Sequence, residues 1–118
     1  MSRYVLEINL SNMTLKDNVE GRIKEMLTEN DYAPKNTDNE AFWAKGDEDN
    51  ETMCCISYEF KEKSLVLMGW IYDATIDVEF DLEYSYLRKL PARSIRNLIE
   101  DIASMAIATT NFGPLLNL

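Results

Sequence analysis

The sequence predicts a two-layer α+β sandwich, with an antiparallel sheet of about five strands and two helices on one face. Apolar residues alternate with period two in several short segments and recur at helical spacing in two longer ones. The predicted order is strand, helix, four strands, helix. Four consecutive strands with short turns favour an antiparallel meander, and the helices must bury their apolar sides against one face of it.

The N-terminal third predicts a strand followed by a helix. Every second residue from Tyr4 to Leu10 is apolar, which is typical of a half-buried strand. Thr14 with Asp17 resembles a capping box with Asp in place of Glu, so we expect a helix to open there and to end near Asn30.

The middle of the chain predicts four strands after a polar connection over residues 35–40. The strongest alternation runs through Thr52 to Phe60, and Leu65 to Tyr72 is apolar on both faces. The expected strands are Ala41 to Lys45, Thr52 to Phe60, Leu65 to Tyr72 and Ile76 to Glu83, separated by a charged turn over residues 46–51, a hairpin turn over 61–64 and a turn at 73–74.

The C-terminal part predicts a second helix, from Pro91 to about Thr109, because proline suits a first helical turn. Asn111 and Gly113 should end it, and the apolar tail Leu115 to Leu118 follows. With 118 residues and neither a repeat nor a linker, residues 1–118 are expected to form a single domain.

Composition excludes several classes of protein. Lys and Arg number 12 against 21 Asp and Glu, which gives a net charge of −9, and histidine is absent. Repulsion from phosphate argues against direct nucleic-acid binding. Histidine-based catalysis and histidine metal ligation are impossible. Neither a signal peptide nor a stretch long enough to span a membrane is recognisable, so we expect a cytoplasmic protein without membrane contact.

The two cysteines are adjacent, at Cys54 and Cys55, within an expected strand. Neighbouring side chains of a strand point to opposite faces, so these two are poorly placed to form a disulfide with each other. Two small, reduced, apolar side chains are the simplest interpretation.

The most unusual segment is the strand from Leu65 to Tyr72. If Leu65, Leu67 and Ile71 face the helices, the alternate residues face the other way. That second set is Val66, Met68, Trp70 and Tyr72. An apolar strip of this size is seldom left exposed to water, and it is usually covered by another part of the chain, a second subunit, a partner or a ligand. The C-terminal tail or the Phe42/Trp43 segment could cover it, a second copy could pair with it, or a partner or ligand could bind there. The opposite orientation would only exchange which apolar set is exposed.

An acidic row follows this strand, with Asp77, Glu79, Asp81 and Glu83 at every second position and Ile76, Val78, Phe80 and Leu82 expected inward. A solvated face that discourages edge-to-edge aggregation is the simplest interpretation. The alternative is a docking surface for a basic protein, as in an immunity or decoy protein. A straight row of carboxylates diverges, which disfavours a calcium site.

Motifs for catalysis are missing. The sequence has no GxSxG, P-loop, GxGxxG or HExxH pattern, and the cysteines have no histidine to act as a base. We therefore expect no enzymatic activity, no catalytic residues, no metal site and no cofactor.

One stretch resembles a small bacterial α+β domain family of unknown function. It covers about residues 20 to 102. The shared features include Trp43-Ala44-Lys45-Gly46, the strand from Cys54 to Phe60, the run Leu67-Met68-Gly69-Trp70-Ile71 and the helix after Pro91. The resemblance implies a bacterial origin and an α+β fold, and it implies no function or site residue.

Taken together, the sequence favours a non-enzymatic protein-interaction module, either monomeric or homodimeric, that uses the helix-free face of its sheet. The expected binding residues are Val66, Met68, Trp70, Tyr72, Asp77, Glu79 and Asp81. The alternative is a small-molecule-binding domain with an apolar pocket between helices and sheet, near Trp43 and Tyr58.

Overall fold

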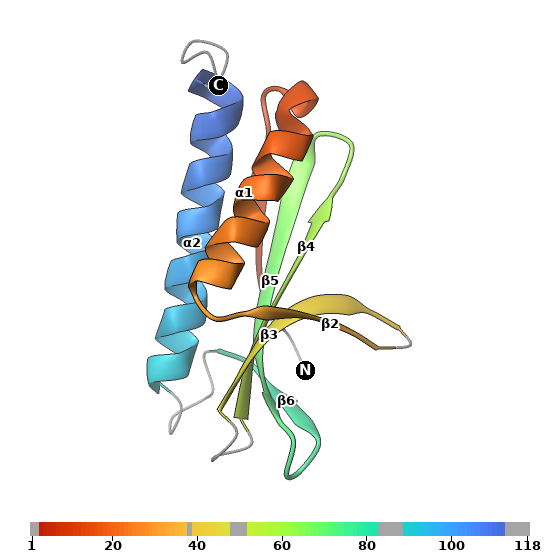
Figure 1. The fold of residues 1–118 in the computed structure, drawn as a ribbon, viewed down its shortest axis with the longest axis vertical. Helices are drawn as coiled ribbons and strands as arrows, with labels where there is room; N and C mark the ends of the chain where they lie inside the picture. The colour runs from red at the N-terminus through yellow and green to blue at the C-terminus, as the bar shows by residue number, and fades with distance from the viewer. Residues whose placement is uncertain (1–2, 38, 48–51, 83–88, 113–118) are drawn as a thin grey trace.

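The structure is a computed structural model, and it describes residues 3–37, 39–47, 52–82 and 89–112. Its elements are β1 (Tyr4–Asn9), the 3-10 helix η1 (Met13–Leu15), α1 (Lys16–Glu29), β2 (Ala33–Asn36), β3 (Ala41–Asp47), β4 (Thr52–Phe60), β5 (Ser64–Asp73), β6 (Val78–Phe80) and α2 (Lys89–Phe112). Both helices lie on one face of the sheet and run in opposite directions (Figure 1). This confirms the predicted two-layer α+β fold.

The sheet is antiparallel throughout its described pairings. Within the described residues it has six strands, in the order β1-β5-β4-β3-β2, and β6 also pairs with β5. β1 pairs with Ser64 to Gly69 and β6 with Ile71 to Asp73, so these two strands share one edge of β5. The remaining edge of β5 pairs with β4 over the whole of β4. The meander β3-β4-β5-β6 is therefore as predicted, and β1 is added beside its central strand.

The main core lies between the sheet and the helices. α1 contributes Val19, Ile23 and Leu27, each with no exposed surface, from the apolar positions recognised in the sequence. α2 contributes a longer apolar side that contacts β5 and β4. Removing this much apolar surface from water is the main stabilising contribution to the fold.

Gly69 allows α2 to approach the sheet closely. A Cβ placed on Gly69 would lie 2.5 Å from Ile95 Cγ2 and 2.7 Å from Ile99 Cδ1. Those distances are far below contact distance, so only glycine fits at this point of β5. The helix consequently lies directly on the backbone of the strand.

Several boundaries differ from the predictions. The short strand β2, which pairs with β3, begins at Ala33 and extends into the polar connection predicted over residues 35–40. The β2–β3 hairpin points away from the helices (Figure 1). The expected cap at Thr14 is wrong: Asn12 caps the 3-10 helix η1, where its side chain accepts hydrogen bonds from the backbone N–H and the hydroxyl of Thr14. The N-cap of α1 itself is Leu15, which makes no side-chain capping bond.

The predicted strand Ile76 to Glu83 is the largest error. Only Val78 to Phe80 are in β6, and Ile76, expected inward, is 56% exposed. Asp77 has a φ of 52°, so the chain turns there and the alternation of Ile76 is broken. Phe80 and Leu82 do pack against the core as expected. Glu83, the residues of the charged turn over 48–51 and the tail Leu115 to Leu118 lie outside the described residues.

Candidate functional site: the helix-free face of the sheet

The alternate residues of β5 separate the two sides of the sheet. Leu65, Leu67 and Ile71 belong to the core beneath the helices. Trp70 belongs to a second, smaller cluster with Ala44 and Cys55. Phe42, Met53, Met68 and Tyr72 pack against that cluster. The strip predicted on β5 thus points away from the helices, onto what we call the helix-free face.

Two residues of the predicted strip are buried within the chain, which corrects the expectation of an exposed strip. Trp70 is only 3% exposed and Val66 only 7%. The Phe42 ring lies 5.6 Å from the Trp70 ring, between centroids. Val66 lies between Glu7 of β1 and Glu59 of β4, which are its direct cross-strand partners.

The remaining apolar surface lies on the helix-free face where the edge strand β1 pairs with β5. Met68 and Tyr72 stay half-buried, and Val5, the cross-strand partner of Met68, is 54% exposed. Both described helices lie on the opposite face of the sheet (Figure 1). Val5 was missed by the sequence analysis because its strand could not be placed beside β5 without knowing the strand order.

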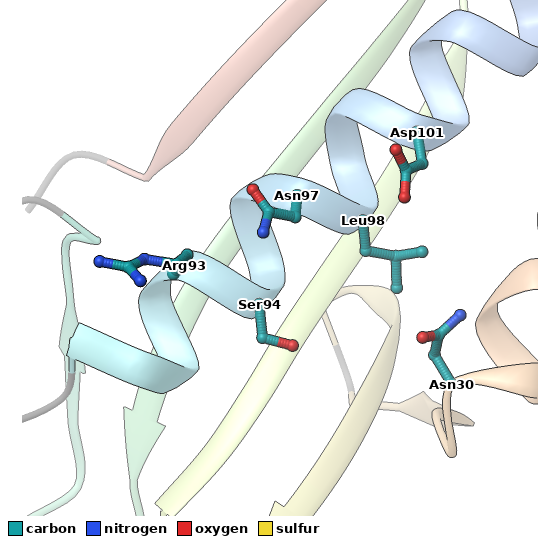
Figure 2. A pocket seen from close by; sticks show the side chains of 6 residues that line it. All are labelled: Asn30, Arg93, Ser94, Asn97, Leu98 and Asp101. Atoms are coloured by element: carbon teal, nitrogen blue, oxygen red, sulfur yellow. The ribbon is translucent and has the colours of Figure 1, made fainter.

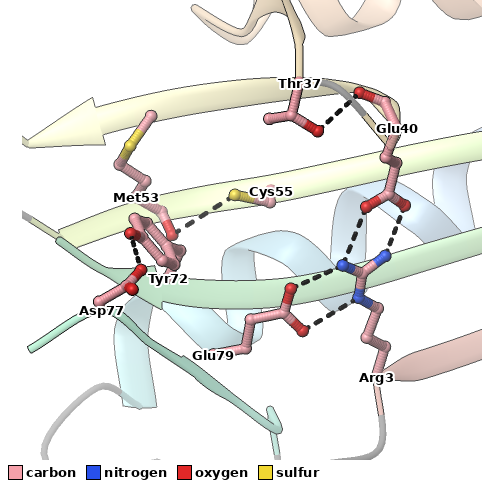
Figure 3. A network of polar contacts seen from close by, with 8 residues as sticks. All are labelled: Arg3, Thr37, Glu40, Met53, Cys55, Tyr72, Asp77 and Glu79. Carbon is pink, nitrogen blue, oxygen red and sulfur yellow. Dashed lines mark hydrogen bonds and ion pairs between the residues drawn. The ribbon is translucent and has the colours of Figure 1, made fainter.

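Arg3 covers Trp70. Its guanidinium carbon lies 3.5 Å from the centroid of the Trp70 ring. Its Nη1 and Nη2 donate hydrogen bonds to the Glu40 carboxylate at 2.6 and 3.0 Å. Its Nη2 and Nε donate to the Glu79 carboxylate at 2.6 and 3.2 Å. Figure 3 shows Arg3 held between the two carboxylates.

This contact joins three distant segments. Arg3 precedes β1, Glu40 precedes β3 in the β2–β3 hairpin, and Glu79 lies in β6. Burial alone would lower the pKa of Arg3, but the hydrogen bonds to Glu79 and Glu40 outweigh this effect and raise it. Arg3 is therefore always charged here, and its single positive charge offsets half of the negative charge of the two carboxylates beside Trp70.

The predicted acidic row is not a straight row. Glu79 faces Tyr72 across β5 and β6, on the helix-free face. Asp77 lies in the preceding turn, where it accepts a hydrogen bond from the Tyr72 hydroxyl (Figure 3). That bond, with smaller effects of burial and nearby charge, raises the pKa of Tyr72. Asp81 follows β6 and is half-buried. The three carboxylates thus lie in different local structures.

The cysteines point to opposite faces, as predicted. Cys54 packs against the main core and Cys55 belongs to the Trp70 cluster, and both are free. Burial raises the pKa of the Cys54 thiol, and burial raises that of Cys55 to about 12. Both groups stay protonated near neutral pH, and a protonated thiol is a poor nucleophile.

A cavity of about 260 Å³ lies where the β2–β3 hairpin separates from β4. Trp43 and Tyr58, the residues predicted for a pocket, both line it, together with Phe42, Glu20 and Ser57. The Tyr58 hydroxyl donates a hydrogen bond to Glu20 Oε2 at 2.8 Å. Ser57 Oγ is buried and has no hydrogen-bond partner among the described residues.

A second cavity, of about 350 Å³, follows the first half of α2 beside the end of α1. Figure 2 shows Ser94 and Leu98 on the side of α2 nearer to Asn30. Arg93, Asn97 and Asp101 complete its lining. Five of its six lining residues are polar or charged, and the sequence predicted no pocket at this place.

The described part of the chain has neither a cluster of metal ligands nor a helix suited to cross a membrane. No group of three or more Cys, Asp or Glu side chains there is placed to hold a metal ion. None of its helices is both long and apolar enough to cross a membrane.

Comparison with known proteins adds no relative. No family model matches the chain, and the searches of curated proteins and of solved structures also return no match. The resemblance to a small bacterial domain family therefore stays a prediction.

Proposed function

We propose that this protein is a cytoplasmic, non-enzymatic interaction module that binds a basic partner protein through the helix-free face of its sheet. The observation that carries the proposal is the cross-strand pair of the exposed Val5 and the half-buried Met68, near the β1 edge of a sheet face with no described helix over it. An apolar centre with a charged rim is the usual composition of a recognition surface.

The charges around this centre favour a basic partner. Glu7 and Glu59 flank it on one side, and Glu40 and Glu79 lie beyond Trp70 on the other. Arg3 compensates only part of this negative charge, and the whole chain has a net charge of −9. A second copy would bring the same charges to the interface, so repulsion disfavours a homodimer. An immunity or decoy role against a basic target fits this chemistry.

A matched pair of variants tests the face. Val5→Asp places a carboxylate in its apolar part, on the edge strand β1, and Ile107→Asp introduces a carboxylate at another exposed apolar residue, on α2. A photo-crosslinking residue at Met68, introduced in cells, should trap a basic protein. Val5→Asp should abolish that crosslink and Ile107→Asp should preserve it.

The electrostatic part of the proposal needs a separate measurement. Binding of the purified trapped partner should weaken as salt rises from about 50 to 500 mM, because salt screens the charges. Affinity that is independent of salt, or equal loss with both variants, would contradict the proposal. If light scattering shows that the protein is a dimer and that Val5→Asp makes it monomeric, the partner at this face is a second copy of the chain and not a basic protein.

A second candidate function is small-molecule binding in the cavity beside β4. The buried Ser57 hydroxyl without a described partner, next to Trp43 and Tyr58, favours it. Screening of small polar aromatic compounds by NMR would test this idea. Chemical-shift changes confined to Ser57, Trp43 and Tyr58 would support it. A screen in which no compound shifts those signals would contradict it.

A further inference from the structure

The Arg3 guanidinium occupies a complete recognition site for a guanidinium group. One aromatic face lies below it at 3.5 Å, and two carboxylates accept its hydrogen bonds from opposite sides. Stacking on an aromatic ring and paired hydrogen bonds to carboxylates are the two contacts that distinguish arginine from lysine. The walls of this site come from β5, β6 and the β2–β3 hairpin, and none of them belongs to the segment that carries Arg3.

The backbone of Arg3 is not held by the sheet. The pairing of β1 with β5 begins at Tyr4 and Gly69, one residue after Arg3. When the Arg3 side chain moves away from Trp70, it therefore loses side-chain contacts, and the strand pairing of the sheet stays intact. The Arg3 side chain is also 21% exposed, so an approaching group can compete for its carboxylate partners.

The site is closed while Arg3 is in place. Trp70 is 3% exposed, and Phe42 packs against it from the side. A ligand can therefore reach the ring only after Arg3 has left. The empty site would leave two carboxylates facing each other across a partly buried ring, an arrangement that favours another cation of the same shape.

We propose that Arg3 is an internal occupant of a site that binds an arginine side chain of the partner protein, and that binding exchanges one guanidinium for the other. This inference rests on the proposed function, since it names the residue type by which the basic partner is recognised. It also makes Arg3 an autoinhibitory contact, because the chain must release its own arginine before it binds.

Fluorescence titration of Trp70 tests the exchange without knowledge of the partner. The chain has two tryptophans, so Trp43→Phe leaves Trp70 as the only reporter. In this background, the Arg3→Gln variant should bind the peptide acetyl-Gly-Arg-Gly-amide at least about tenfold more tightly than the chain that keeps Arg3. If Arg3 fills the site nine-tenths of the time, only about one-tenth of the molecules can bind the peptide, and the apparent affinity falls by that factor. The matched lysine peptide should bind the opened site more weakly.

A third variant locates the bound peptide. Arg3→Gln combined with Glu79→Gln removes one carboxylate of the site and should lose the gained affinity. Equal affinity with and without Arg3, no preference for arginine over lysine, or unchanged binding after Glu79→Gln would each overturn the proposal. If Arg3→Gln fails to fold by circular dichroism, Arg3→Lys keeps the charge without the planar group, and it should give the same ranking of peptides.

The two proposals can fail separately. If the peptide does not bind to Arg3→Gln while Val5→Asp still abolishes the crosslink from Met68, the face binds a partner without exchanging Arg3. If the peptide binds as expected but no basic partner is trapped, the arginine site stands and its use in partner recognition falls.

Discussion

At the scale of single residues, Gly69 shows how one position sets the distance between the layers. Its missing side chain is the space that Ile95 and Ile99 occupy. From the sequence this glycine is predicted only to lie in a strand, because period-two alternation cannot say which helix residue will lie over it. The close packing of α2 on β5 therefore depends on contacts between residues that are far apart in the chain.

Gly69→Ala should destabilise the protein by about 1–3 kcal/mol, because the added methyl group must displace two packed isoleucines. Gly21→Ala is the matched control. Nothing lies within 4 Å of a Cβ placed on Gly21, which is in the middle of α1. There the same change should stabilise by about 0.5–1 kcal/mol, since alanine favours the helix. Urea unfolding measures both, and equal effects would contradict the close packing at Gly69.

Cys55 makes stability depend on pH in the alkaline range. Burial raises its pKa to about 12, whereas an unfolded cysteine titrates at about 8.5. A raised pKa means that the folded state keeps a proton that the unfolded state loses. The corresponding stability is fully present below the lower value and is lost as pH rises toward the higher one, by up to about 1.4 kcal/mol per pH unit.

Cys55→Ala should therefore lose less stability than the wild type between about pH 8 and pH 10, where an unfolded cysteine loses its proton. Ser57→Ala is the control, because it also shortens a buried side chain on this face but removes no titrating group. Its profile should run parallel to that of the wild type. Urea unfolding at each pH gives the free energies, and parallel profiles for all three proteins would show that Cys55 titrates normally.

At the scale of elements, alternation predicted the strands that have one face in the core. β4 has the predicted bounds, Thr52 to Phe60, and β5 extends one residue beyond the prediction at each end. These strands are long and lie in the middle of the sheet, so period two persists along them. The same reasoning divided the apolar residues of β5 into the correct two sets, but it left open which set meets the helices, and the structure shows that Leu65, Leu67 and Ile71 do.

Alternation failed where local geometry or pairing overrides it. All four residues of β2 are exposed, and one of them is Pro34, so nothing in their composition indicates a strand. β6 is shorter than predicted because the chain turns at Asp77 with a positive φ. The exposure of the candidate site was mispredicted for a related reason. Arg3 and Glu40 reach Trp70 only because strand order brings three segments together, and strand order cannot be read from local spacing.

The contact between Arg3 and Glu40 should hold the β2–β3 hairpin against the rest of the sheet. Glu40→Ala should raise hydrogen exchange of the hairpin amides by about fivefold, which corresponds to about 1 kcal/mol for a partly exposed ion pair. The amides of β4 that pair with β5 should not change. Glu29→Ala, which removes a Glu partner of Arg22 in α1, is the control. Unchanged exchange in the Glu40 variant would show that β3 alone holds the hairpin.

At the scale of the whole molecule, the fold leaves its two sides with different roles. The side under the helices holds the large apolar core, and the helix-free side holds a small cluster around Trp70 beneath charged side chains. Most of the stability should come from the first side. Changes on the second can therefore alter binding with little loss of folding, which is why variants of Val5 and Arg3 are informative tests.

The net charge of −9 should itself oppose folding, because the compact state brings like charges together. Added salt screens this repulsion, so the midpoint of thermal unfolding should rise between about 20 and 300 mM KCl. A gain of about 1 kcal/mol would raise it by about 4 °C. Glu100→Gln with Asp101→Asn, both exposed on α2, changes the net charge from −9 to −7 and should reduce the rise. A midpoint that falls with salt would instead mean that attractive pairs, such as those of Arg3 with Glu40 and Glu79, outweigh the net repulsion.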